Sequence, residues 1–154
     1  MNGRFRILSV LLGCAAGVTL FLSAIELAVN ALQVFTATWW IAGELSGAVY
    51  PLAIGVRDLC FGGVLLLLHR FASDLEKGEP LFSPKQPPRF LLMGLLSAWC
   101  FVLGFLIELS SISYSGLNGF FSYLIHGGRL DYVQLLPTVS FLVLWRVFDA
   151  SCRR

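Results

Sequence analysis

The chain has 154 residues, of which 57% are hydrophobic and only 13% are charged, and its formal net charge is +2. Soluble globular domains carry about 25% charged residues, so this composition excludes a water-soluble domain. The mean hydropathy of +0.80 indicates that the lipid bilayer is the solvent. We therefore expect a single integral membrane domain over residues 1–154.

Four apolar stretches follow one another along the chain, at about 7–27, 50–68, 90–109 and 130–147. Each approaches the length of about 20 residues that a helix needs to cross a hydrocarbon layer of ~30 Å. Backbone amides in lipid must find their hydrogen bonds within the chain, which favours helices. The predicted fold is all-α, a four-helix transmembrane bundle made of two helical hairpins.

The first apolar stretch follows Arg4 and Arg6 and so resembles the beginning of a secretory signal peptide. The residues Leu11-Leu12-Gly13-Cys14 also resemble a lipoprotein cleavage box. The apolar run, however, continues for about a dozen residues beyond Cys14, where a processed lipoprotein enters polar sequence. We therefore expect a retained first helix rather than a cleaved leader.

Basic residues predict how the helices are oriented, because cytoplasmic loops carry an excess of Lys and Arg. One predicted side holds nine of the eleven: Arg4, Arg6, Arg70, Lys77, Lys85, Arg89, Arg146, Arg153 and Arg154. The other side holds only Arg129, and the loop over 33–49 has neither Lys nor Arg. We expect both termini and the linker over 71–88 to be cytoplasmic.

The linker over 71–88 is the only clearly hydrophilic part of the chain. Asp74, Glu76 and Lys77 are expected to extend the second helix by a turn into water. Gly78 is expected to cap that helix, and Pro80 prevents its continuation. Four prolines over 80–88 predict a stiff, extended connector before the third helix.

A short motif in this linker carries a family resemblance. Its residues are Leu75, Gly78, Pro80, Phe82 and Ser83. With the four spans and the cytoplasmic ends, the motif resembles the DUF2975 family of uncharacterised bacterial four-helix membrane proteins, although Leu81 separates the proline from the phenylalanine. The resemblance implies the bacterial inner membrane and no particular activity.

Ionisable residues within the spans are the candidate functional residues, because each costs several kcal/mol in lipid unless it is paired or hydrated. At the rise of a helix, Glu26, Arg57 with Asp58, and Glu108 are expected to lie at similar depths, near the outer boundary of the membrane. One hypothesis is a structural ion pair from Arg57 to Glu26 or Glu108. The others are an outer-leaflet polar cavity that binds a cation or a small polar ligand, and an interface with a partner protein.

Small residues indicate where helices approach one another closely. Gly13 and Gly17 form a small-xxx-small step in the first stretch, and Gly62 and Gly63 lie in the second. We expect these glycines to form packing faces inside the bundle, with a dimer seam as the alternative.

No catalytic triad, glycine-rich phosphate loop or metal-ligand spacing is present in the sequence. We therefore expect neither an enzyme nor a cofactor or metal site, and the scattered basic residues do not predict nucleic-acid binding. The expected function is that of an accessory or regulatory inner-membrane protein that acts through a membrane-protein partner. The alternative is a small homo-oligomeric transporter or channel subunit that uses Glu26, Arg57 and Glu108.

Overall fold

The computed structural model describes the backbone of residues 3–36, 45–112 and 132–153, and the side chains of 6–32, 52–107 and 135–153. These residues form four α-helices and no strand. The helices are α1 (Gly3–Thr36), α3 (Leu45–Glu76), α4 (Gln86–Ile112) and α6 (Tyr132–Cys152). The predicted all-helical fold is thus confirmed for the described part of the chain. The loops expected on the outer side fall mainly on 37–44 and 113–131, outside the described residues.

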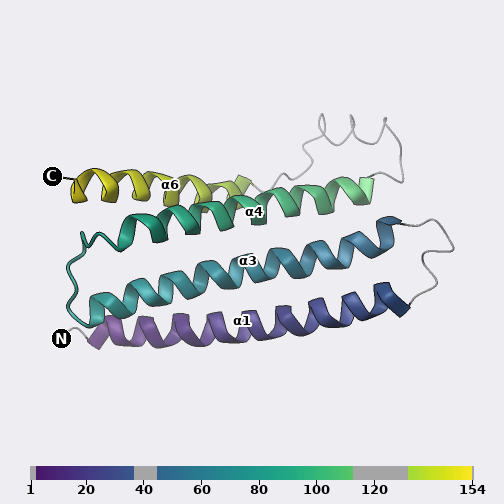
Figure 1. Ribbon diagram of the computed structural model, residues 1–154, viewed down its shortest axis with the longest axis horizontal. Coiled ribbons are helices and arrows are strands. Elements are labelled where there is room, and N and C mark those ends of the chain that lie inside the picture. Colours follow the sequence, from purple (N-terminus) through teal and green to yellow (C-terminus); the bar gives the residue numbers. More distant parts are fainter. Residues whose placement is uncertain (1–2, 37–44, 113–131, 154) are drawn as a thin grey trace.

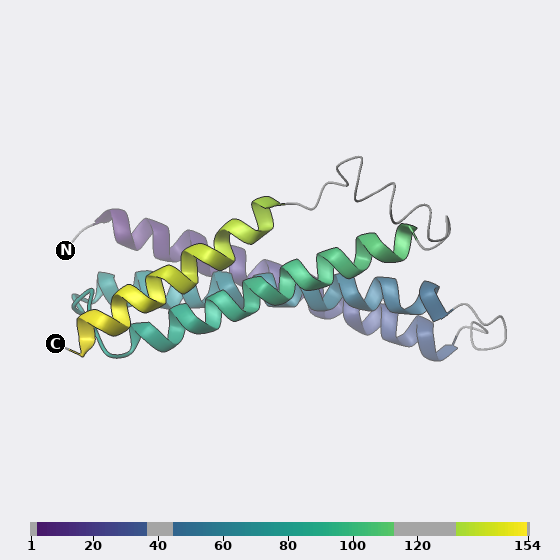
Figure 2. The ribbon, with the colours of Figure 1, turned by 90° about the horizontal axis from the view of Figure 1, so that it is seen from above.

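The four helices lie side by side in the order α1, α3, α4, α6, as Figure 1 shows. The most extensive contact joins α1 to α3, followed by α4 with α6 and α3 with α4. Figure 2 shows that α1 and α6 slope in opposite directions across the inner pair. The beginning of α1, the end of α6 and the connector between α3 and α4 all lie at one end of the molecule (Figure 1).

Each helix contains a stretch that is long and apolar enough to cross a membrane: Arg6–Leu32, Leu52–Glu76, Gln86–Ile107 and Leu135–Cys152. Between 11% and 22% of the residues in the most apolar window of these stretches are buried inside the protein. Large apolar side chains therefore point outward, among them Phe21 at 65% exposure and Leu136 at 70%. So large an apolar surface requires a lipid environment, which supports a membrane-embedded protein.

The helices extend beyond the apolar stretches on which the prediction was based. Helix α3 continues to Glu76, so the expected extension is confirmed for Asp74 and Glu76, while Lys77 lies in the turn that follows. Helix α4 begins at Gln86, so Pro87 and Pro88 belong to its first turn rather than to an extended connector. Proline fits there because the first N–H groups of a helix have no partner within the helix.

The hydrophobic core lies at the connector end of α3, α4 and α6. Its buried members are Val64, Phe90, Met93 and Phe148. Phe148 of α6 lies 4.7 Å from Phe90 of α4 and 6.5 Å from Phe71 of α3, measured between ring centroids. These rings join three helices at one level, while the extensive contact of α1 is with α3.

Glycines allow α3 to pack closely on both sides. A Cβ at Gly62 would lie 2.7 Å from Leu20 of α1, and a Cβ at Gly63 would lie 3.1 Å from Leu96 of α4. On α1, Gly13 makes room for the His69 ring, whereas Gly17 has no such neighbour within 4 Å. Of the predicted small-xxx-small step, only Gly13 therefore lies in a helix contact.

A hydrogen bond between α3 and α1 also depends on Gly13. The Nδ1 atom of His69 lies 2.7 Å from the main-chain oxygen of Ser9. Because a carbonyl oxygen can only accept, the ring must donate from Nδ1. His69 therefore joins α1 to α3 near the connector end.

Candidate functional site

Among the predicted ionisable residues whose side chains are described, Arg57 pairs with Asp58 and not with Glu26. Arg57 and Asp58 form an ion pair within α3, in which Nε and Nη2 each lie 3.0 Å from Oδ1 of Asp58. Glu26 is exposed on α1, while its neighbour Leu27 packs against Gly55 of α3. Glu108 belongs to α4, but its side chain lies outside the described residues. The ion pair of the Arg57 guanidinium is thus local to α3.

A cavity of about 560 Å³ opens beside this ion pair, between α3, α4 and α6. This volume lies within the range of about 300–1,000 Å³ that is usual for small-molecule sites. The lining residues are Arg57, Asp58, Phe61, Val64, Leu65 and Leu68 of α3, Ser97 and Cys100 of α4, and Pro137 and Phe141 of α6.

The cavity has a charged end and an apolar end. Arg57 and Leu68 are eleven residues apart on α3, which corresponds to roughly 16 Å along the helix. Val64, Leu68 and Phe141 line the cavity and also belong to or pack against the core cluster. The cavity therefore extends from the charged pair toward the core at the connector end.

Short polar side chains of α4 form part of the cavity wall. The Cys100 thiol donates a hydrogen bond to the main-chain oxygen of Arg57, with a sulfur–oxygen distance of 3.4 Å. Ser97 lies one helical turn away and is 7% exposed. Both residues leave more space than the bulky aliphatic side chains common elsewhere in α4.

Sequence reasoning identified the charged residues of this cavity but missed its apolar walls. Phe61, Leu65 and Phe141 look like any other apolar residues of a membrane span. Pro137, inside α6, was the one usable signal, because a proline interrupts the hydrogen bonding of a membrane helix and marks an irregularity.

The motif residues in the connector build the turn from α3 into α4. The N–H of Gly78 bonds to the oxygen of Leu75 at 3.2 Å, and the N–H of Glu79 to the oxygen of Asp74 at 3.0 Å. This pair of bonds is the Schellman motif. It requires the left-handed backbone that Gly78 adopts, with φ at 82°. The expected glycine cap is confirmed.

The second half of the motif begins α4. Ser83 accepts hydrogen bonds from the N–H of Gln86 at its main-chain oxygen and from the N–H of Lys85 at its hydroxyl, at 2.9 and 3.5 Å. The Phe82 ring lies 5.2 Å from that of Phe148, so the connector is held against α6. Pro80 lies between the two helices, in the part of the chain that is not helical.

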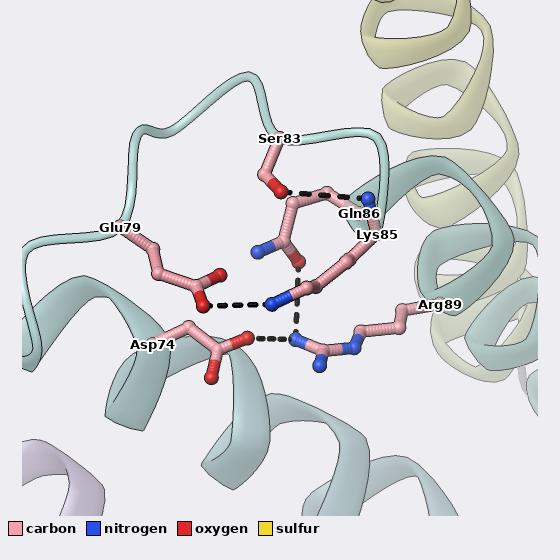
Figure 3. Close-up of polar contacts among 6 residues, drawn as sticks. All are labelled: Asp74, Glu79, Ser83, Lys85, Gln86 and Arg89. Carbon is pink, nitrogen blue, oxygen red and sulfur yellow. Dashed lines mark hydrogen bonds and ion pairs between the residues drawn. The ribbon is translucent and has the colours of Figure 1, made fainter.

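Ion pairs surround this turn, as Figure 3 shows. Arg89 of α4 binds Asp74 of α3 through Nη1 and Oδ2, and the same nitrogen lies 3.4 Å from Oε1 of Gln86. Lys85 binds Glu79 at 2.8 Å. This hydrogen bond, together with the charge of the carboxylate, raises the pKa of Lys85. The motif residues and these ion pairs thus fix the connector geometry.

Comparison with protein-family models, curated proteins and solved structures finds no match for this chain. The resemblance to the DUF2975 family therefore stays a prediction based on the linker motif.

Proposed function

We propose that this chain is a multi-pass protein of the bacterial inner membrane that binds a membrane-soluble ligand in the α3–α4–α6 cavity. In this proposal it acts as an accessory or regulatory subunit and does not catalyse a reaction. Both termini and the connector face the cytoplasm, as the distribution of Lys and Arg indicates. The observation that carries the proposal is a cavity of about 560 Å³ with Arg57 and Asp58 at one end.

The ion pair supports binding more than a structural role between helices. A pair that holds helices together joins residues of different helices, whereas Arg57 contacts its own neighbour in the sequence. Both side chains remain about one third exposed, at 33% and 35%. Charged groups inside a span usually mark a pathway or a ligand site, and these two border the cavity.

Glu26 supports the part of the proposal that concerns partners. It is exposed on α1, inside the apolar stretch Arg6–Leu32. A carboxylate that faces lipid is costly, whereas one that faces a partner helix can be hydrogen-bonded. We therefore infer that this face of α1 meets another protein or a second copy, as the transporter alternative also requires.

The test uses protein purified in mild detergent from native membranes, followed by mass spectrometry of the bound small molecules. Leu65→Trp fills the apolar wall of the cavity, and Val56→Trp, at a 40% exposed position of α3 outside the lining, is the matched control. We expect wild type and the control to retain a bound molecule that Leu65→Trp loses. Equal retention by all three proteins would overturn the proposal.

The alternative function is tested with the protein in sealed vesicles. Proton-coupled uptake of the retained molecule that disappears with Glu26→Gln would replace the accessory role with transport. A chain that binds without transporting gives the same trapped amount in wild-type and Glu26→Gln vesicles.

A further inference from the structure

The cavity lies inside the membrane, so its occupant comes from the lipid phase. All ten lining residues fall within the apolar stretches Leu52–Glu76, Gln86–Ile107 and Leu135–Cys152. The part of the wall formed by Phe61, Leu65 and similar side chains offers water no hydrogen bonds, unlike the end with Arg57 and Asp58. Hydrocarbon is the material that fits these walls and surrounds them.

The charged end of the cavity offers one positive and one negative group to the same occupant. Oδ1 of Asp58 accepts both contacts from Arg57. The ion pair therefore engages one carboxylate oxygen, and the second oxygen and further guanidinium N–H groups remain for a ligand. Arg57 lies thirteen residues from Arg70, or roughly 20 Å along α3. A lipid headgroup can meet it from the outer side, helped by the reach of a long arginine side chain.

We propose that the occupant is a single phospholipid whose zwitterionic headgroup carries a primary ammonium. This inference rests on the proposed ligand-binding function and names its ligand class. The guanidinium of Arg57 binds the phosphate, for which arginine is well suited, and Asp58 accepts from the ammonium. One acyl chain runs down the apolar wall toward Leu68.

Charge complementarity selects this class among membrane lipids. An anionic headgroup without an amine brings its negative charge beside Asp58 and offers that carboxylate at most neutral hydroxyl donors, which bind it more weakly than an ammonium does. A cationic amphiphile brings its positive charge beside Arg57 and has no anionic group to bind the guanidinium. A trimethylammonium headgroup carries the right charges but has no N–H, so it cannot form the charge-assisted hydrogen bond to Asp58.

The experiment measures lipid binding to delipidated full-length protein by native mass spectrometry. Three probes with identical acyl chains are compared: phosphatidylethanolamine, phosphatidylcholine and phosphatidylglycerol. We expect phosphatidylethanolamine to bind at least about tenfold more tightly than the other two, the ratio that loss of one charge-assisted hydrogen bond produces. Asp58→Asn is expected to reduce this preference, and Arg57→Gln to weaken binding of all three lipids.

Two outcomes separate the inference from the proposed function. Equal affinity of the wild-type protein for phosphatidylethanolamine and phosphatidylcholine overturns the headgroup assignment but leaves a cavity that binds lipid. If Leu65→Trp binds all lipids as tightly as Val56→Trp does, both the headgroup assignment and the proposed ligand-binding function are overturned. Because the lipid series is measured on wild-type protein, the inference remains testable even where a charge variant does not fold.

Discussion

Replacing Phe148 by alanine tests whether the aromatic cluster at the connector end holds α3, α4 and α6 together. Phe148 is 6% exposed, and its ring lies 6.5, 5.2 and 4.7 Å from those of Phe71, Phe82 and Phe90. In lipid the transfer term is small, because the surrounding acyl chains are also apolar. The main loss is therefore that of the three ring pairs, which at about 0.5–1.5 kcal/mol each total about 1.5–4.5 kcal/mol.

The assay is reversible unfolding in mixed detergent micelles, followed by circular dichroism. Phe21→Ala is the matched control, since Phe21 is 65% exposed and belongs to α1. We expect Phe148→Ala to lower the free energy of unfolding by about 1.5–4.5 kcal/mol and Phe21→Ala by less than about 0.5 kcal/mol. Equal losses from the two substitutions would refute the assignment of the core to the connector end.

Three further predictions use the same unfolding measurement. Gly62→Leu, at the contact with α1, is expected to lower the free energy of unfolding by about 1–3 kcal/mol, whereas Gly17→Leu is expected to leave it unchanged. Similar values for the two variants would contradict the assignment of Gly62 to the α1–α3 contact. Gly78→Ala forces alanine into a left-handed backbone and is expected to cost about 1–2 kcal/mol, whereas a loss below that of Gly17→Ala would argue against the cap. A double-mutant cycle of Asp74→Asn with Arg89→Gln should give a coupling of about 0.5–3 kcal/mol, and additive effects would show that this ion pair contributes nothing.

The helices could be predicted from the sequence because lipid imposes a simple rule. Long apolar runs must become helices, and the residues that end a helix have a specific chemistry, as Gly78 and Pro80 show. Four prolines over 80–88 predict a stiff, extended connector that includes Pro87 and Pro88. The structure places them in the first turn of α4, where the missing N–H groups cost little.

The cavity could not be predicted in the same way. In a membrane span, residues that face lipid, pack in the core or line a cavity are all apolar, so Leu65 and Leu136 carry the same signal. Arg57 was visible because a charge in a span is rare. Its pairing with Asp58 is harder to predict, because carboxylates of other helices at the same depth, Glu26 and Glu108, are equally plausible partners from the sequence.

Labelling of one cysteine in the connector tests most directly how the chain crosses the membrane. Leu81→Cys, at a position 45% exposed in the structure, is introduced into a variant whose four native cysteines are replaced by serine. A membrane-impermeant maleimide is then applied to whole bacterial cells and to permeabilised cells. We predict a membrane-bound protein that is labelled only after permeabilisation. Labelling in whole cells, or recovery of the protein in the soluble fraction, would contradict the account.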